Sequence, residues 1–327
     1  MPMLMRHWMP ILALLLPLGV AAQEFPIAGK PVVIMGGFPN GTGVDIYARM
    51  IAERLSPVLG VPVVADNRVG AGGNIAMEYV SKQAPDGHTI LFVTSAMLAI
   101  NPALYARMPV DPQTELAPLM TLADVPNVLT VSVEKRPQLD SCAKVIAAAK
   151  AAPGTFNYAS TGNGASTHLA GAQFAMAAGL DLVHVPYRGG PFAMTALLAG
   201  DVDIFFYQTG PVIGAWKQGQ VRLLGVTSAA PVGALPGVPT IAEACNLPGF
   251  VSTTWYGLSL PKGVPQPIVD RLYREISAIV TVPEFNQRIL DQALTPMVEG
   301  PAEMRARTER DLVHWREIVR KSGARVE

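Results

Sequence analysis

Residues 31–65 read "PVVIMGGFPNGTGVDIYARMIAERLSPVLGVPVVA" and contain a complete strand–loop–helix–strand pattern. The first five residues are apolar and mostly β-branched, which is typical of a buried strand. Apolar side chains then recur from Ile46 to Leu59 with the spacing of one helix face, and Gly60 can end that helix. Residues 61–65 predict a second strand. Two strands joined through a helix favour a parallel βαβ unit.

The same alternation continues to the end of the chain. A mature chain of about 300 residues exceeds what one hydrophobic core usually serves, so we expect two lobes. The fold class is therefore α/β, with a mainly parallel sheet in each lobe, flanking helices and a ligand cleft between the lobes. We predict lobe 1 at 23–124 and 250–327 and lobe 2 at 125–249. Further strands are expected at 89–94, 128–133, 156–159, 182–185, 202–206, 221–227 and 255–260, and helices at 140–152 and 167–178 and after residues 74, 191, 267 and 301.

The N-terminal residues 1–22 have the pattern of a secretory signal peptide. Arg6 and His7 form a short positive region, residues 8–20 are almost wholly apolar, and small residues end at Ala22. The apolar run is short for a membrane span, which takes roughly 20 residues. An uncleaved anchor is the alternative, but no stop-transfer pattern follows. We expect cleavage near Ala22 and a periplasmic protein.

Composition excludes several classes of function. The chain has 25 basic and 25 acidic residues, so it offers no electrostatic reason to bind nucleic acid. Neither a CxxC nor an HxxxH motif is present, and we predict no metal and no cofactor. An exported protein can form a disulfide between Cys142 and Cys245, but the pattern favours two separate buried thiols.

Four strand-to-helix loops are the candidate ligand site, because ligands of parallel α/β sheets bind where strands end. These loops, at 36–44, 95–101, 160–166 and 207–210, contain no charged residue, histidine or cysteine. They offer glycines, hydroxyls, amides and N–H groups at helix starts, which can hold an anion through aligned dipoles. They lack the groups that move protons or attack a substrate, so we predict that the protein is not an enzyme.

The first loop is the richest in such groups. Gly41 and Gly43 allow close approach of the backbone to a ligand, and Asn40 and Thr42 can donate hydrogen bonds. The alternative is an ordinary strand–helix turn. Asp45 is predicted to be the N-cap of the helix rather than a ligand contact.

The third loop has the same design at a second helix start, where hydroxyls and an amide surround Gly162 and Gly164. Two such loops at corresponding places suggest a ligand held between two lobes. His168 lies inside the following helix, where a structural imidazole is favoured over a catalytic base. Trp255 and Tyr187 can either line the cleft or pack in a core. No nucleotide-binding or nucleophile-elbow motif is present.

A succession of blocks resembles one known family. These blocks include "GGFPNGTGVDIYAR", "NRVGAGGN", "YASTGNGASTHLAG", "LLAGDVDIFF" and "WYGLSLPKGVP", and they extend from about Lys30 to Gly323. They resemble the Bug family, the substrate-binding receptors of tripartite tricarboxylate transporters. The resemblance implies a monomeric periplasmic receptor that binds a small carboxylate and delivers it to membrane permease subunits. A sensor that docks on a membrane kinase, or a periplasmic hydrolase, is the alternative.

The resemblance also implies which residues bind the ligand. The carboxylate is expected between the first and third loops, and its far end near the second and fourth. Four positions depart from the common family pattern: Gly37, Asn40, Thr42 and Ala165. These departures affect which acid the protein binds more than whether the ligand is an anion. The implied ligand-binding residues are Phe38, Asn40, Gly41, Thr42, Gly43, Ser95, Ala96, Ser160, Thr161, Gly164, Ala165, Ser166 and Gln208.

Overall fold

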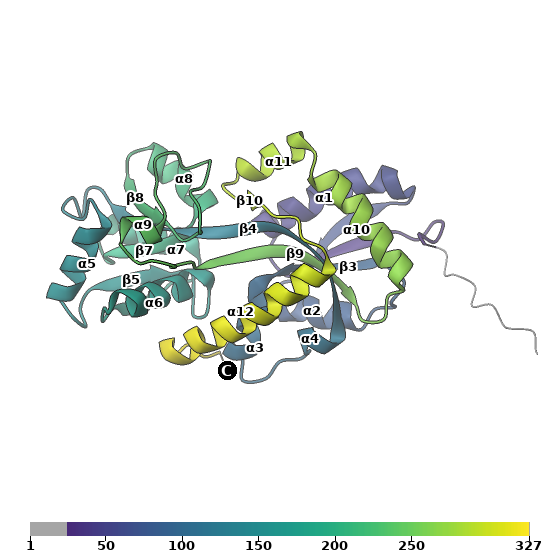
Figure 1. Cartoon of the computed structure of the whole chain (residues 1–327), viewed down its shortest axis with the longest axis horizontal. Coiled ribbons are helices and arrows are strands. Elements are labelled where there is room, and N and C mark those ends of the chain that lie inside the picture. Colours follow the sequence, from purple (N-terminus) through teal and green to yellow (C-terminus); the bar gives the residue numbers. More distant parts are fainter. Residues whose placement is uncertain (1–24, 327) are drawn as a thin grey trace, which may run out of the picture.

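The computed structural model describes residues 25–326, arranged as two lobes side by side (Figure 1). The predicted signal peptide at 1–22 and its cleavage near Ala22 lie outside the described residues. Among the helices at 25–326, none is both long and apolar enough to cross a membrane.

The first lobe is a five-stranded sheet in the order β2-β1-β3-β9-β4, with β10 paired to the far side of β4. β1, β2 and β3 are mutually parallel, whereas β9 and β4 run antiparallel to their neighbours. Helices α1, α10 and α11 cover one face, and α2, η2 and α12 pack on the other. The bounds are β1 (Val32–Gly36), α1 (Gly43–Leu59), β2 (Val63–Asn67), α2 (Asn74–Ser81), β3 (Thr89–Thr94), η2 (Ala96–Ile100), β4 (Leu116–Ser132), β9 (Thr253–Pro261), α10 (Gln266–Val280), α11 (Pro283–Leu290), β10 (Thr295–Pro296) and α12 (Pro301–Ser322).

The second lobe continues from the other half of β4, which pairs with β7 on one side and β8 on the other; β5 and β6 follow β7. Two hydrophobic clusters fill its two faces, one under α7 and α8 and one under α5, α6 and α9. The bounds are α5 (Cys142–Ala151), β5 (Asn157–Ser160), α6 (Ser166–Ala178), β6 (Val183–Pro186), α7 (Gly190–Ala199), β7 (Ile204–Gln208), α8 (Thr209–Lys217), β8 (Val221–Val226) and α9 (Ile241–Ala244).

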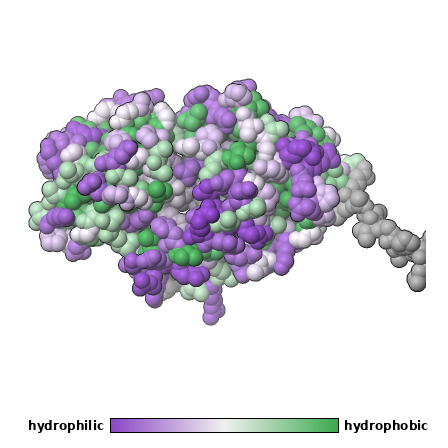
Figure 2. Space-filling model, viewed as in Figure 1, coloured by the Kyte–Doolittle hydropathy of each residue, from purple (hydrophilic) through white to green (hydrophobic). Residues whose placement is uncertain are grey.

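Three short helical segments complete the first lobe: η1 (Ala71–Gly73), α3 (Asn101–Leu104) and α4 (Pro112–Glu115). Helix α12 crosses from the first lobe to the second, and Trp315 packs in one cluster with Leu104 of α3 and Leu169 of α6. Figure 2 shows hydrophilic side chains on the face that this helix crosses. The helix therefore packs against both lobes with its inner face.

The 17-residue strand β4 is shared by both sheets. Residues 116–126 pair with β9, and residues 127–132 pair with β7 and β8. The sequence predicts only the second half of this strand, because Pro118 and Pro126 interrupt the first half. The predicted boundary between residues 124 and 125 lies inside β4.

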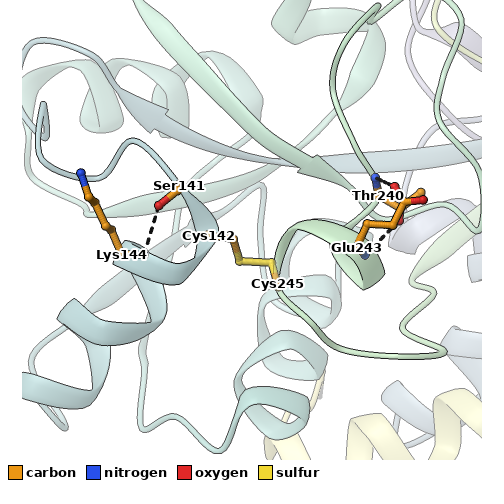
Figure 3. The surroundings of a disulfide bond; sticks show 6 residues. All are labelled: Ser141, Cys142, Lys144, Thr240, Glu243 and Cys245. Carbon is orange, nitrogen blue, oxygen red and sulfur yellow. Dashed lines mark hydrogen bonds between the residues drawn. A yellow bond between two sulfur atoms is a disulfide. The ribbon is translucent and has the colours of Figure 1, made fainter.

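Cys142 and Cys245 form a disulfide that joins the start of α5 to the end of α9, so the expectation of two separate thiols was wrong (Figure 3). Both helices pack in the same cluster below the second sheet, which places the two Cα atoms 5.1 Å apart. A capping box between Thr240 and Glu243 fixes the start of α9. The sequence separation of 103 residues gives no sign of this proximity.

Candidate functional site

The carboxyl-terminal edges of the two sheets face each other along β4. In the first lobe the end of β3 aligns with Tyr256 of β9 and then with Ala123 of β4. In the second lobe Gln208, the last residue of β7, pairs with Asn127 of β4. Ala123 and Asn127 are four residues apart, which along a strand corresponds to about 13 Å. The predicted loops therefore project from the two lobes toward a common space.

The first loop is held in place by the buried carboxylate of Asp45. Its oxygens accept hydrogen bonds from Gly41 N at 2.9 Å, from Asn67 Nδ2 at 2.6 Å and from Arg49 Nε at 3.0 Å. Asn67 Nδ2 also donates to Asn40 Oδ1 at 2.8 Å. The bond from Arg49, helped by the Gly41 and Asn67 donors, lowers the pKa of Asp45 from 3.8 to about 2. The Gly41 N–H is therefore occupied within the loop and is not free for a ligand.

Helix α1 begins at Gly43, and its N-cap is Thr42, three residues before the predicted N-cap. The prediction of Asp45 as N-cap was wrong, because Asp45 is the third residue of the helix, within its first turn, and its carboxylate accepts from the loop instead. The Thr42 hydroxyl donates to Pro39 O, and among the described residues no side chain caps α1. The first N–H groups of this helix are thus available for an anion.

Tyr256 is a candidate site residue that the sequence reasoning missed. A Cβ atom built on Gly43 would lie 3.0 Å from the Tyr256 hydroxyl oxygen, so the phenol lies beside the start of α1. The ring packs on Phe92, and burial raises the pKa of Tyr256 to about 12. A neutral phenol at a helix N-terminus is a hydrogen-bond donor for an anion. Its only signal in the sequence was its place in the "WYGLSLPKGVP" block.

The second predicted loop is not a loop, because residues 95–101 are almost wholly helical in η2 and the start of α3. Ser95 is fully buried, and its hydroxyl oxygen accepts from the N–H of Trp255 at 3.2 Å. Ser95 therefore fixes β9 to the end of β3. Ala96 is half-buried at the start of η2. The side chain of Asn101 donates to Gly72 O and to Asn74 Oδ1, which stabilises this irregular segment.

The third loop uses most of its own donors. Ser160 is buried, and its hydroxyl bonds to both Gly162 N and Gly162 O at 3.1 Å. Thr161 N donates to the Thr167 hydroxyl at 2.9 Å, and Ala165 N donates to Gly162 O at 3.2 Å. The half-buried Ser166 begins α6, and within the described chain no side chain caps this helix. The α6 N-terminus is therefore the part of the loop that can meet an anion.

The lobes touch at two places beside the predicted site. A Cβ atom on Gly164 would lie 2.1 Å from Leu104 Cδ2 of the first lobe, and this glycine has a φ of +73°. On the other side, the Thr209 hydroxyl donates to Ala293 O at 2.7 Å. The predicted loop at 207–210 consists of the end of β7 and the start of α8, with Gln208 at the junction.

Comparison of the sequence with known families finds a match over most of the chain. The family described as "Tripartite tricarboxylate transporter family receptor" matches residues 47–324. The chain belongs to this family. It is a solute-binding receptor, and the resemblance to the Bug proteins is confirmed.

Three solved structures resemble this receptor over nearly their whole length. An R. palustris protein solved with adipate is 30% identical with a TM-score of 0.81, covering 93% of this chain and 100% of that one. The periplasmic binding protein BugD is 30% identical with a TM-score of 0.75, covering 91% and 99%. MatC from Rhodopseudomonas palustris, solved with malate, is 26% identical with a TM-score of 0.75, covering 90% and 100%.

Several predictions for single residues of the receptor can now be judged. His168 is a structural imidazole as predicted, because it is buried and its Nδ1 accepts from Gly164 N at 3.1 Å. Trp255 packs in the core and donates from Nε1 to Asp311 Oδ2 at 2.7 Å. Tyr187 packs at the edge of the second-lobe core. Phe38 packs between both cores of the first lobe and supports the first loop.

Proposed function

We propose that this receptor captures a small organic carboxylate between its lobes in the periplasm and delivers it to the permease subunits of a membrane transporter. The single observation that carries the proposal is the pair of helix N-termini, α1 and α6, that no side chain caps within the described residues. They belong to opposite lobes, and each follows a strand whose carboxyl end faces the other lobe. Two positive dipole ends suit an anion better than any other solute.

The proposed binding residues divide by role. Gly43 and Ser166 belong to the two helix starts and offer N–H groups, and Ser166 also offers a hydroxyl. Thr42 is the N-cap residue of the first of these helices, with its hydroxyl and N–H both donating to Pro39 O. Tyr256 adds a phenol donor beside Gly43. The other predicted residues shape the site from behind or line its far end: Phe38, Asn40, Gly41, Ser95, Ala96, Ser160, Thr161, Gly164, Ala165 and Gln208.

The relatives support the carboxylate class. The similar proteins solved with adipate and with malate hold dicarboxylic acids, and BugD is described as a periplasmic binding protein. The signal-peptide pattern of residues 1–22 supports the same compartment. We further propose that the ligand leaves unchanged. The Ser160 hydroxyl lies 2.6 Å from His184 Nε2, but it is fully buried and donates to Gly162 O, and the Thr42 hydroxyl donates to Pro39 O, so neither is free to attack a ligand.

A panel of carboxylates tests this function by thermal shift. Adipate, malate and aromatic monoacids are compared with their neutral amides and with sugars at matched concentration. A ligand at about 100 times its Kd stabilises a protein by roughly 2.7 kcal/mol, which raises the midpoint temperature of thermal unfolding measurably. Stabilisation by an acid but not by its amide supports the proposal. Stabilisation by a sugar or a cation alone would overturn it, and chromatography after incubation shows whether the acid is recovered intact.

A further inference from the structure

Two histidine rings are stacked directly behind the third loop. His168 of α6 and His184 of β6 have ring centroids 3.7 Å apart and planes within 2° of parallel. His168 Nδ1 accepts from Gly164 N at 3.1 Å, and His184 Nε2 lies 2.6 Å from the Ser160 hydroxyl oxygen. The pair therefore holds one residue at each end of the segment that precedes the α6 N-terminus.

The geometry requires the His168 ring to be neutral. His168 Nδ1 accepts a hydrogen bond, so its proton is on Nε2, and a second proton on Nδ1 would break the bond to Gly164. The Ser160 hydroxyl donates to Gly162 O, so His184 Nε2 donates to the hydroxyl oxygen and keeps that bond whether or not the ring is protonated. Two charged rings at this separation would also repel each other. Burial lowers the pKa of His184 to about 4, and burial together with the neighbouring His184 ring lowers the pKa of His168 to about 3.

The rings also line a cavity of about 400 Å³ between the second lobe and the C-terminal end of α12. The charged groups on its walls are Lys321 and Arg325 near the end of α12 and Asp181 before β6. Tyr158 of β5 packs against both rings. Because two of these charged groups are cations and one is a carboxylate, the walls disfavour protonation of the two histidines. The cavity lets protons reach the rings without unfolding of the protein.

We propose that His168 and His184 are positioning residues that hold the third loop in its anion-binding conformation, and that His168 does so only while its ring is neutral. This inference rests on the proposed function, because it concerns how the α6 N-terminus is presented to the carboxylate. Neither residue contacts the ligand in this arrangement; each acts through Gly164 or Ser160. Protonation of His168 at Nδ1 releases Gly164 and weakens binding.

Matched substitutions test the proposal by calorimetry with adipate, or with the best acid of the panel. Asparagine at 168 places an oxygen near the position of Nδ1, and glutamine at 184 places a donor near Nε2, so His168→Asn and His184→Gln should bind within about threefold of the parent. His168→Leu and His184→Leu should each bind about tenfold more weakly, since each loses a buried hydrogen bond. Circular dichroism confirms that each variant is folded.

The pH profile separates positioning from a merely structural role. In the parent, affinity should fall as the pH drops through about 3, where His168 becomes protonated and its Nδ1 no longer accepts from Gly164. The double variant His168→Asn/His184→Gln should show only the decline that comes from protonation of the ligand itself. Identical profiles for the parent and the double variant, or folded leucine variants that bind as tightly as the parent, would overturn the proposal.

A failure of the proposed function can be distinguished from a failure of the positioning role. If no acid of the panel binds, hydrogen exchange of the Gly164 amide and the ¹⁵N shifts of the His168 ring still report the loop. Protection of Gly164 in the parent and in His168→Asn, with its loss in His168→Leu, supports positioning. Equal exchange in all three proteins contradicts it.

Discussion

Replacing Asp45 by asparagine is expected to destabilise the protein in a pH-dependent way. The Asp45 side chain is only 5% exposed, and its pKa is lowered from 3.8 to about 2 by Arg49, Gly41 and Asn67. One pKa unit corresponds to about 1.4 kcal/mol, so ionised Asp45 stabilises the folded state by about 2 kcal/mol. A lowered carboxyl pKa gives stability that is complete above pH 3.8 and lost as the pH falls through about 2.

Urea unfolding of parent and Asp45→Asn between about pH 2 and pH 7 measures this contribution. The free energy of unfolding should differ by about 2 kcal/mol at neutral pH and converge toward the acid end. The variant should also bind the panel acid more weakly, because Gly41 and Asn67 lose a charged partner. Glu53→Gln removes an exposed carboxylate from the same helix and serves as the control. A difference that is the same at every pH would refute the reasoning.

Three further perturbations follow from the geometry. Replacing Cys142 and Cys245 together by serine should lower the free energy of unfolding by about 2–4 kcal/mol, and an unchanged urea midpoint would contradict this. Tyr256→Phe should weaken acid binding about fivefold with little change in thermal midpoint, since one hydrogen bond contributes about 1 kcal/mol; equal calorimetric affinity would exclude the phenol from the site. Gly164→Ala should weaken binding and stability, because its Cβ would meet Leu104 at 2.1 Å. Adding Leu104→Ala should recover part of that loss, and no recovery would argue against the contact.

Short-range sequence patterns predict those parts of this receptor whose structure depends mainly on residues close together in the chain. The strand–helix–strand unit at residues 31–65, the end of α1 at Gly60 and the glycine-rich start of α6 all follow from periodicity and from the special conformations of glycine. The four predicted segments therefore lie at strand ends, although 95–101 is helical and 207–210 consists of the end of β7 and the start of α8. The neutral character of the site was also visible, because it depends on which residue types are absent.

The sequence does not predict which donors remain free after folding. Gly41, Ala165 and Thr161 all carry N–H groups in the candidate loops, but hydrogen bonds within the loops occupy them. Long-range contacts are equally hidden. The pairing of the first half of β4, the Cys142–Cys245 bond and the place of Tyr256 beside α1 each join residues far apart in the chain. Such contacts depend on the finished fold and leave no local pattern.

The shared strand β4 has a consequence for how the protein folds. Neither sheet is complete without its own half of this strand, and the single peptide bond between residues 126 and 127 links the two halves directly. If one lobe unfolds, its half of β4 loses its hydrogen-bonding partners, while the other half of β4 still belongs to the folded lobe. Denaturation is therefore expected as one cooperative transition, and expression of either lobe alone should give aggregation-prone chains with an unpaired edge.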